Sequence, residues 1–174
     1  MSDFPETPEA CARLFAARRG CRILLAPARG LHGDVLETSR SSILKAFGRR
    51  EAFEAELRVY RRLEAAAVER VGRFHVPVLL GVDERLGVLE ITRVQPPYAL
   101  DFAAVTLDRT PEEVWADQPG RIQAAWARAE EAFSGHTPAQ WAEVERLYEQ
   151  FGERFGVWML DLHPGNIAFE AEGG

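Results

Sequence analysis

Residues 50–68 narrow the possible folds of this chain most, because their spacing predicts an amphipathic helix with an acid inside its apolar face. Five apolar residues recur at steps of three and four: Phe53, Leu57, Tyr60, Leu63 and Ala67. This spacing puts them on one side of a helix. At 100° per residue, Glu56 falls within the same arc, between Leu57 and Leu63. A carboxylate on a buried face needs a partner, so we expect the fold to supply one.

Short β-like runs lie on both sides of this helix. Three runs precede it and two follow it, separated by polar or glycine-containing turns: 22–25, 35–38, 42–47, 76–80 and 88–92. The pattern predicts a five-stranded antiparallel sheet with one helix inserted after the third strand. Before the sheet, Thr7 as a cap, Pro8 at the first helical position and Gly20 as a stop predict one more helix.

A break at Gln95-Pro96-Pro97 separates this part from a mainly helical remainder. We therefore expect a single α+β domain with two lobes, 1–97 and 98–174. Thr110 and Thr137 each begin a capping-box pattern with proline at the first helical position. The second pattern predicts a helix from Pro138 that ends at Gly156.

The rest of the second lobe adds one more helix and a strand–loop–strand segment. The helix is expected over 121–133, after the turn 117–120. Near the end of the chain, 157–160 and 167–169 are apolar runs that enclose the loop 161–166.

Charge is unevenly distributed along the sequence. Residues 1–100 carry 16 basic and 13 acidic side chains, whereas residues 101–174 carry 5 and 14. The acidic second part speaks against binding of nucleic acid or of an anionic membrane there. Lys45 is the only lysine among 21 basic residues, and an ammonium and a guanidinium are not interchangeable at a tight site.

The sequence also bears on location and redox state. No stretch approaches the roughly 20 uninterrupted apolar residues that a membrane span requires. The first residues have neither a basic cap nor an apolar run, so we expect a cytoplasmic protein. Cys11 and Cys21 have no metal-ligand spacing, and we expect two reduced, half-buried thiols.

Asp161 and Asn166 are the residues that point most clearly to chemistry. They are five positions apart on a loop that contains Pro164 and Gly165, and the loop doubles back between two strands. A carboxylate can orient or deprotonate an attacking hydroxyl, and an amide oxygen can help to hold Mg²⁺. This pair therefore suits phosphoryl transfer.

The loop sequence Asp161-Leu-His-Pro-Gly-Asn166 resembles the catalytic loop of the aminoglycoside and choline phosphotransferase branch of the protein-kinase-like superfamily. The resemblance extends over about residues 21–170, by order and spacing more than by identity. It implies a kinase-like fold, ATP and Mg²⁺ as cofactors, and a small-molecule hydroxyl as acceptor. Asp161 would act as the catalytic residue and Asn166 as a metal ligand.

The same resemblance assigns roles in the first lobe. Lys45 would bind the nucleotide phosphates, and Glu56 would hold Lys45 in an ion pair. Gly30 and Gly33 occupy the place of the phosphate-covering loop, although two glycines are a weak signal. Residues 93–97 would be the hinge whose backbone meets adenine.

The chain departs from the family pattern in three places. Met159 stands where a histidine or tyrosine is usual, and the helical substrate-binding portion is missing. Downstream of Asn166 the only acids are Glu170 and Glu172, without the turn context of a second metal-binding aspartate. Loss of one metal ligand would slow the reaction by orders of magnitude.

Simpler explanations exist for each residue. Lys45 could be a solvated strand-end lysine, Glu56 a carboxylate at the edge of the apolar face, and Asp161 with Asn166 a turn cap. His163 is expected to brace the loop by hydrogen bonding. At the level of function, the alternative to a phosphotransferase is a pseudokinase-like module that binds nucleotide or a protein partner without catalysis. An unrelated α+β protein with a chance loop match is the third hypothesis.

Overall fold

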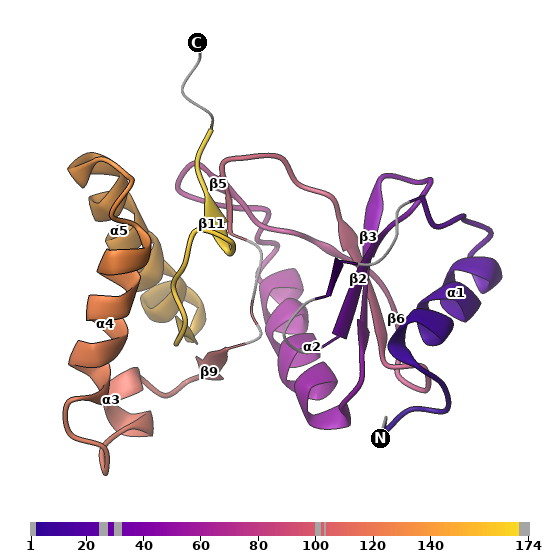
Figure 1. Cartoon of the computed structure of the whole chain (residues 1–174), viewed down its shortest axis with the longest axis horizontal. Coiled ribbons are helices and arrows are strands. Elements are labelled where there is room, and N and C mark those ends of the chain that lie inside the picture. Colours follow the sequence, from indigo (N-terminus) through magenta and orange to yellow (C-terminus); the bar gives the residue numbers. More distant parts are fainter. Residues whose placement is uncertain (1–2, 25–27, 30–32, 100–101, 103, 171–174) are drawn as a thin grey trace. The chain divides into compact units, whose positions relative to one another are not determined.

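The chain is α+β and divides by its internal contacts into two compact units. A computed structural model describes residues 3–24, 28–29, 33–99, 102 and 104–170 (Figure 1). The first unit comprises Met1–Ala65 and Pro77–Arg93, and the second comprises Ala66–Val76 and Val94–Gly174. The division falls close to the expected break after residue 97, but it groups 66–76, which we had placed in the first lobe, with the second unit.

A five-stranded antiparallel sheet forms the centre of the first unit. Its order is β1-β2-β3-β7-β6. The strands are β1 (Ala28–Arg29), β2 (Gly33–Glu37), β3 (Ser42–Phe47), β7 (Val88–Thr92) and β6 (Leu79–Asp83). The five antiparallel strands and the helix after the third are confirmed.

Two strand predictions were wrong in their positions. In the predicted first strand 22–25, Ile23 forms an isolated bridge to Thr38, Leu25 lies outside the described residues, and β1 lies further along the chain. The predicted strand 76–80 begins instead at Leu79. Pro77 lacks a backbone N–H and cannot donate to a ladder, which accounts for the later start.

Helices α1 (Pro8–Arg18) and α2 (Arg50–Ala65) cover the two faces of this sheet (Figure 1). Thr7 caps α1, with Pro8 at its first position, as predicted. Helix α2 ends three residues earlier than expected. Ala67 is exposed with φ 50°, so it is not on the apolar face. Val59 is buried there instead.

Successive side chains of β3 point to opposite faces of the sheet. Leu44 and Ala46 lie on the α1 side and are fully buried. Lys45 and Phe47 lie on the α2 side, where Phe47 contacts Phe53 edge to face at 5.7 Å. The pleat therefore aims Lys45 at α2.

In the described residues of the second unit, the helices are α3 (Pro111–Val114), α4 (Arg121–Ala132) and α5 (Pro138–Phe155). The capping boxes at Thr110 and Thr137 are both formed, as predicted. Gly156 ends α5 in a left-handed conformation with φ 64°, which glycine adopts at little cost.

Short strands tie this unit together. One sheet has the order β11-β8-β5-β4, and β9 pairs with β10. The strands are β4 (Arg70–Val71), β5 (Phe74–His75), β8 (Tyr98–Ala99), β9 (Val105–Leu107), β10 (Val157–Met159) and β11 (Ile167–Ala168). The loop 160–166 is thus held by β10 at one end and by β11 at the other, as the strand–loop–strand prediction required.

The two thiols are more deeply placed than expected. Cys11 is 0% and Cys21 8% exposed, and neither forms a disulfide. Burial raises the pKa of the Cys11 thiol, which keeps it protonated. Across the described ranges, no helix is long and apolar enough to cross a membrane.

Candidate functional site

Lys45 and Glu56 form an ion pair in the first unit. Lys45 lies on β3 between Val35 of β2 and Leu89 of β7. Its Nζ donates to Oε1 of Glu56, which projects from α2. The exposed fraction is 15% for the Lys45 side chain and 1% for that of Glu56. The partner expected for the acid on the apolar face is therefore the chain's only lysine.

The surroundings explain why the pair forms. Glu56 lies in a row of buried α2 residues with Phe53 and Tyr60, and an uncompensated charge there is unfavourable. The Lys45 stem crosses the sheet surface while its ammonium meets the carboxylate. The result is a positive group held at a fixed place beside the sheet, which can contact an anionic ligand.

A second buried polar network occupies the α1 side of the sheet, and the sequence patterns did not predict it. Glu90 of β7 is 2% exposed. Its Oε1 accepts from Ser42 Oγ at 2.7 Å, and its Oε2 lies 3.0 Å from Arg19 Nη2. The Ser42 hydroxyl also lies 2.7 Å from that of Thr38. The only sequence signal was an acid in the apolar run 88–91.

Of the two glycines of the expected phosphate-covering loop, Gly33 lies within the described residues. Gly30 lies outside the described residues. Gly33 begins β2, and a Cβ there would lie 1.9 Å from the carbonyl oxygen of Ala46. Close approach of two strands is therefore a sufficient reason for glycine at this position.

In the second unit, the loop 161–166 is a compact turn organised by His163. The His163 carbonyl accepts from the N–H of Asn166 at 2.9 Å and of Ile167 at 3.1 Å. Its ring Nδ1 accepts from the N–H of Gly165 at 3.0 Å. The ring packs so closely on Gly165 that a Cβ there would lie 2.7 Å from Cε1. His163 thus braces the loop, as expected.

Asp161 and Asn166 meet across this turn. Asn166 Nδ2 donates to the Asp161 carbonyl at 3.4 Å, so the amide oxygen remains the atom suited to a cation. The Asp161 carboxylate is 59% exposed and lies 3.9 Å from His163 Nε2. The arrangement suits both a cation or proton acceptor and the simpler turn cap.

In the described part of the chain, no group of three or more His, Cys, Asp or Glu side chains is arranged to hold a metal ion. Glu170, the acid that follows β11, is 65% exposed and lies 3.7 Å from Arg73. Glu172 lies outside the described residues.

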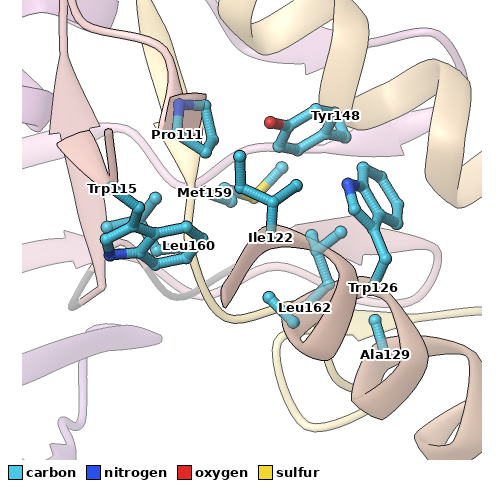
Figure 2. A pocket seen from close by; sticks show the side chains of 10 residues that line it. Pro111, Trp115, Ile122, Trp126, Ala129, Tyr148, Met159, Leu160 and Leu162 are labelled. Carbon is cyan, nitrogen blue, oxygen red and sulfur yellow. The ribbon is translucent and has the colours of Figure 1, made fainter. Parts of the chain in front are cut away.

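An apolar pocket lies against the same loop in the second unit (Figure 2). Leu160 and Leu162, the neighbours of Asp161, both line it. Across the pocket, the rings of Trp126 and Tyr148 meet edge to face at 5.0 Å. Burial, aided by the negative charge of Glu112, raises the pKa of Tyr148 to about 12. The phenol therefore stays neutral at physiological pH.

Sequence spacing did not reveal this pocket, because its residues come from α3, α4, α5, β10 and the loop 160–166. Comparisons with protein-family models, with curated proteins and with solved structures gave no match to this chain.

Proposed function

We propose that this chain is an ATP- and Mg²⁺-dependent phosphotransferase of the kinase-like superfamily that acts on the hydroxyl of a small molecule. The observation that supports the proposal most is the Lys45–Glu56 pair. A buried carboxylate holds the ammonium of the chain's only lysine on the middle strand of a five-stranded antiparallel sheet. Such a fixed cation suits the phosphates of a nucleotide.

Each predicted residue has a role in this proposal. Lys45 binds the nucleotide phosphates, and Glu56 holds Lys45 in place. Asp161 accepts the proton of the substrate hydroxyl. The oxygen of that hydroxyl forms a bond to the terminal phosphorus of ATP, and the bond between this phosphorus and the ADP oxygen breaks. A carboxylate and an amide oxygen are ligands of the type that Mg²⁺ takes, so Asn166 would help to hold it. A Mg²⁺ ion held there would supply positive charge to neutralise the phosphates.

A second candidate function is a pseudokinase-like module that binds nucleotide, or a protein partner, without catalysis. It is favoured by the position of Glu170. That side chain points to Arg73, and an acid already paired with an arginine is a poor substitute for a second metal-binding aspartate.

A thermal-shift titration with ATP, with and without Mg²⁺, tests the nucleotide site. Lys45→Met removes the cation proposed to bind phosphate. Arg19→Met is the matched control, because it removes the cation of the other buried acid, Glu90, from the opposite face of the same sheet. Both substitutions leave a buried carboxylate without its cation, so the readout is the shift caused by ATP and not the melting temperature itself.

The proposal expects a Mg²⁺-dependent rise that persists in Arg19→Met and disappears in Lys45→Met. No rise in the unsubstituted chain at millimolar ATP would overturn both nucleotide-based candidates. A rise that survives Lys45→Met would remove Lys45 from the site.

Turnover separates the two candidates. A phosphotransferase should release ADP when offered a panel of hydroxylated small molecules, and Asp161→Asn should abolish the release while keeping the ATP-induced shift. A binding module should show the shift with every variant except Lys45→Met and no ADP release with any.

A further inference from the structure

The backbone of the first turn of α2 is capped from a distant part of the sequence. Arg49, which precedes the helix, lacks the short polar side chain of a good N-cap. Instead, the N–H of Arg50 donates to Oδ2 of Asp3 at 3.0 Å. The N–H of Asp3 in turn donates to the carbonyl of Gly48 at 3.0 Å. The carboxylate of Asp3 therefore accepts a hydrogen bond from one of the N–H groups of α2 that have no partner within the helix. Its negative charge also interacts favourably with the helix dipole.

Phe4 packs at the same place. Its side chain is 6% exposed and meets Phe53 of α2 edge to face at 5.8 Å. The Arg50 guanidinium lies 4.9 Å from the centre of its ring. A Cβ on Gly87 would lie 2.4 Å from the same ring. Phe4 thus joins α2 to the turn between β6 and β7.

These contacts continue to the ion pair. Phe53 precedes Glu56 by three positions, so both lie on the same face of α2. Phe53 also contacts Phe47, which shares a face of β3 with Lys45. A change in the position of the first turn of α2 would therefore move Glu56 relative to Lys45.

We propose that Asp3 and Phe4 are positioning residues for the Lys45–Glu56 pair: they seat the first turn of α2 and keep the pair closed. Its consequence for ligand binding rests on the proposed nucleotide site, whereas the effect on the pair itself does not. Weakening the contacts of Asp3 and Phe4 with α2 exposes the Lys45 ammonium and moves it away from the position in which it would bind an anionic ligand.

The single lysine makes the closed pair directly measurable. Acylation of this chain by an amine reagent, followed by peptide mass spectrometry, reports on Lys45 apart from the terminal amine. Asp3 is exposed, so Asp3→Ala removes the cap without opening the core. Loss of a cap shifts a local opening equilibrium by about fivefold, and Lys45 should be acylated faster by about that factor.

Two further variants make the result specific. Asp3→Asn keeps an acceptor oxygen and should restore slow acylation. Thr7→Ala removes the side-chain cap of α1, the helix on the opposite face of the sheet, and should leave the Lys45 rate unchanged. Equal rates in all variants would overturn the proposal, as would an equal acceleration in Asp3→Ala and Thr7→Ala.

ATP titration of the same variants separates the inference from the proposed function. If the unsubstituted chain binds ATP, Asp3→Ala should weaken binding by about the factor seen in acylation, and unchanged affinity would contradict the role in positioning Lys45 for phosphate. If the unsubstituted chain does not bind ATP, the proposed function fails. The acylation rates still decide whether Asp3 positions the pair.

Discussion

At the residue scale, the pairing of Lys45 with Glu56 has the largest predictable energetic consequence. Glu56 is 1% exposed, and removing the cation of a buried ion pair leaves the charge of the carboxylate poorly compensated. We expect Lys45→Met to lower the free energy of unfolding by about 3 kcal/mol, measured by urea denaturation.

The double variant Lys45→Met/Glu56→Leu is the control, because it replaces both charges by apolar groups of similar volume. It should recover most of the loss, to within about 1 kcal/mol of the unsubstituted chain. A double variant that is no more stable than Lys45→Met would show that the pair is not the source of the loss.

Gly165 is a second residue at which one substitution has a predictable effect, because an added Cβ would meet the His163 ring. A Cβ there would lie 2.7 Å from Cε1 and 2.9 Å from Nδ1 of His163. The imidazole is 42% exposed and can swing outward, so we expect Gly165→Ala to cost no more than about 1 kcal/mol of stability. It should, however, break the bond between the residue-165 N–H and the ring.

Amide NMR measures this change as a shift of the residue-165 signal and as faster hydrogen exchange. Gly135→Ala is the matched control, because a Cβ at Gly135 meets nothing within 4 Å. If the residue-165 amide of Gly165→Ala stays protected, the His163 ring does not hold this turn.

At the element scale, α5 packs closely against Trp158 of β10 at Gly152. Replacing this glycine by alanine should therefore have the opposite of its usual effect on stability. Gly→Ala inside a helix ordinarily stabilises by about 1 kcal/mol. At Gly152, a Cβ would lie 2.4 Å from three atoms of the Trp158 ring on β10. We expect Gly152→Ala to destabilise the protein by about 1–3 kcal/mol through overpacking, measured by urea denaturation.

The Trp158→Leu background tests the cause. With the indole removed, Gly152→Ala should become neutral or stabilising, because only the helix propensity remains. The same loss in both backgrounds would place the strain elsewhere.

At the scale of the whole molecule, the buried phenol of Tyr148 makes stability depend on alkaline pH. Its pKa is raised to about 12 in the folded state, against about 10 in an unfolded chain. Above pH 10 the unfolded state loses the proton and the folded state keeps it, so ionisation favours unfolding. The free energy of unfolding should fall as the pH rises from 10 towards 12.

Tyr148→Phe removes this contribution. The stability difference between the variant and the unsubstituted chain, measured by urea denaturation at several pH values, should therefore grow in favour of the variant above pH 10. A constant difference would mean that the phenol titrates alike in both states.

Much of the local structure was predictable from sequence. Strands β3 and β7 and helix α5 have the predicted bounds, because alternation, a capping box and a terminal glycine are signals carried by neighbouring residues. Strands of two or three residues, such as β4, β5, β8 and β9, carry no such periodicity. Only their partners from elsewhere in the chain specify them.

The sequence by itself determined the α+β class, the helix inserted after the third strand, and the need of Glu56 for a partner, since each follows from periodicity and from the cost of burying a charge. It also singled out Asp161 and Asn166, whose roles stay a proposal.

Only the tertiary structure decided which groups meet across long separations. Glu90 finds Arg19 across 71 positions, and Asp3 caps α2 across 47. No local pattern encodes such pairs, because an isolated acid or arginine reads as solvated until folding removes the water and makes a specific partner necessary.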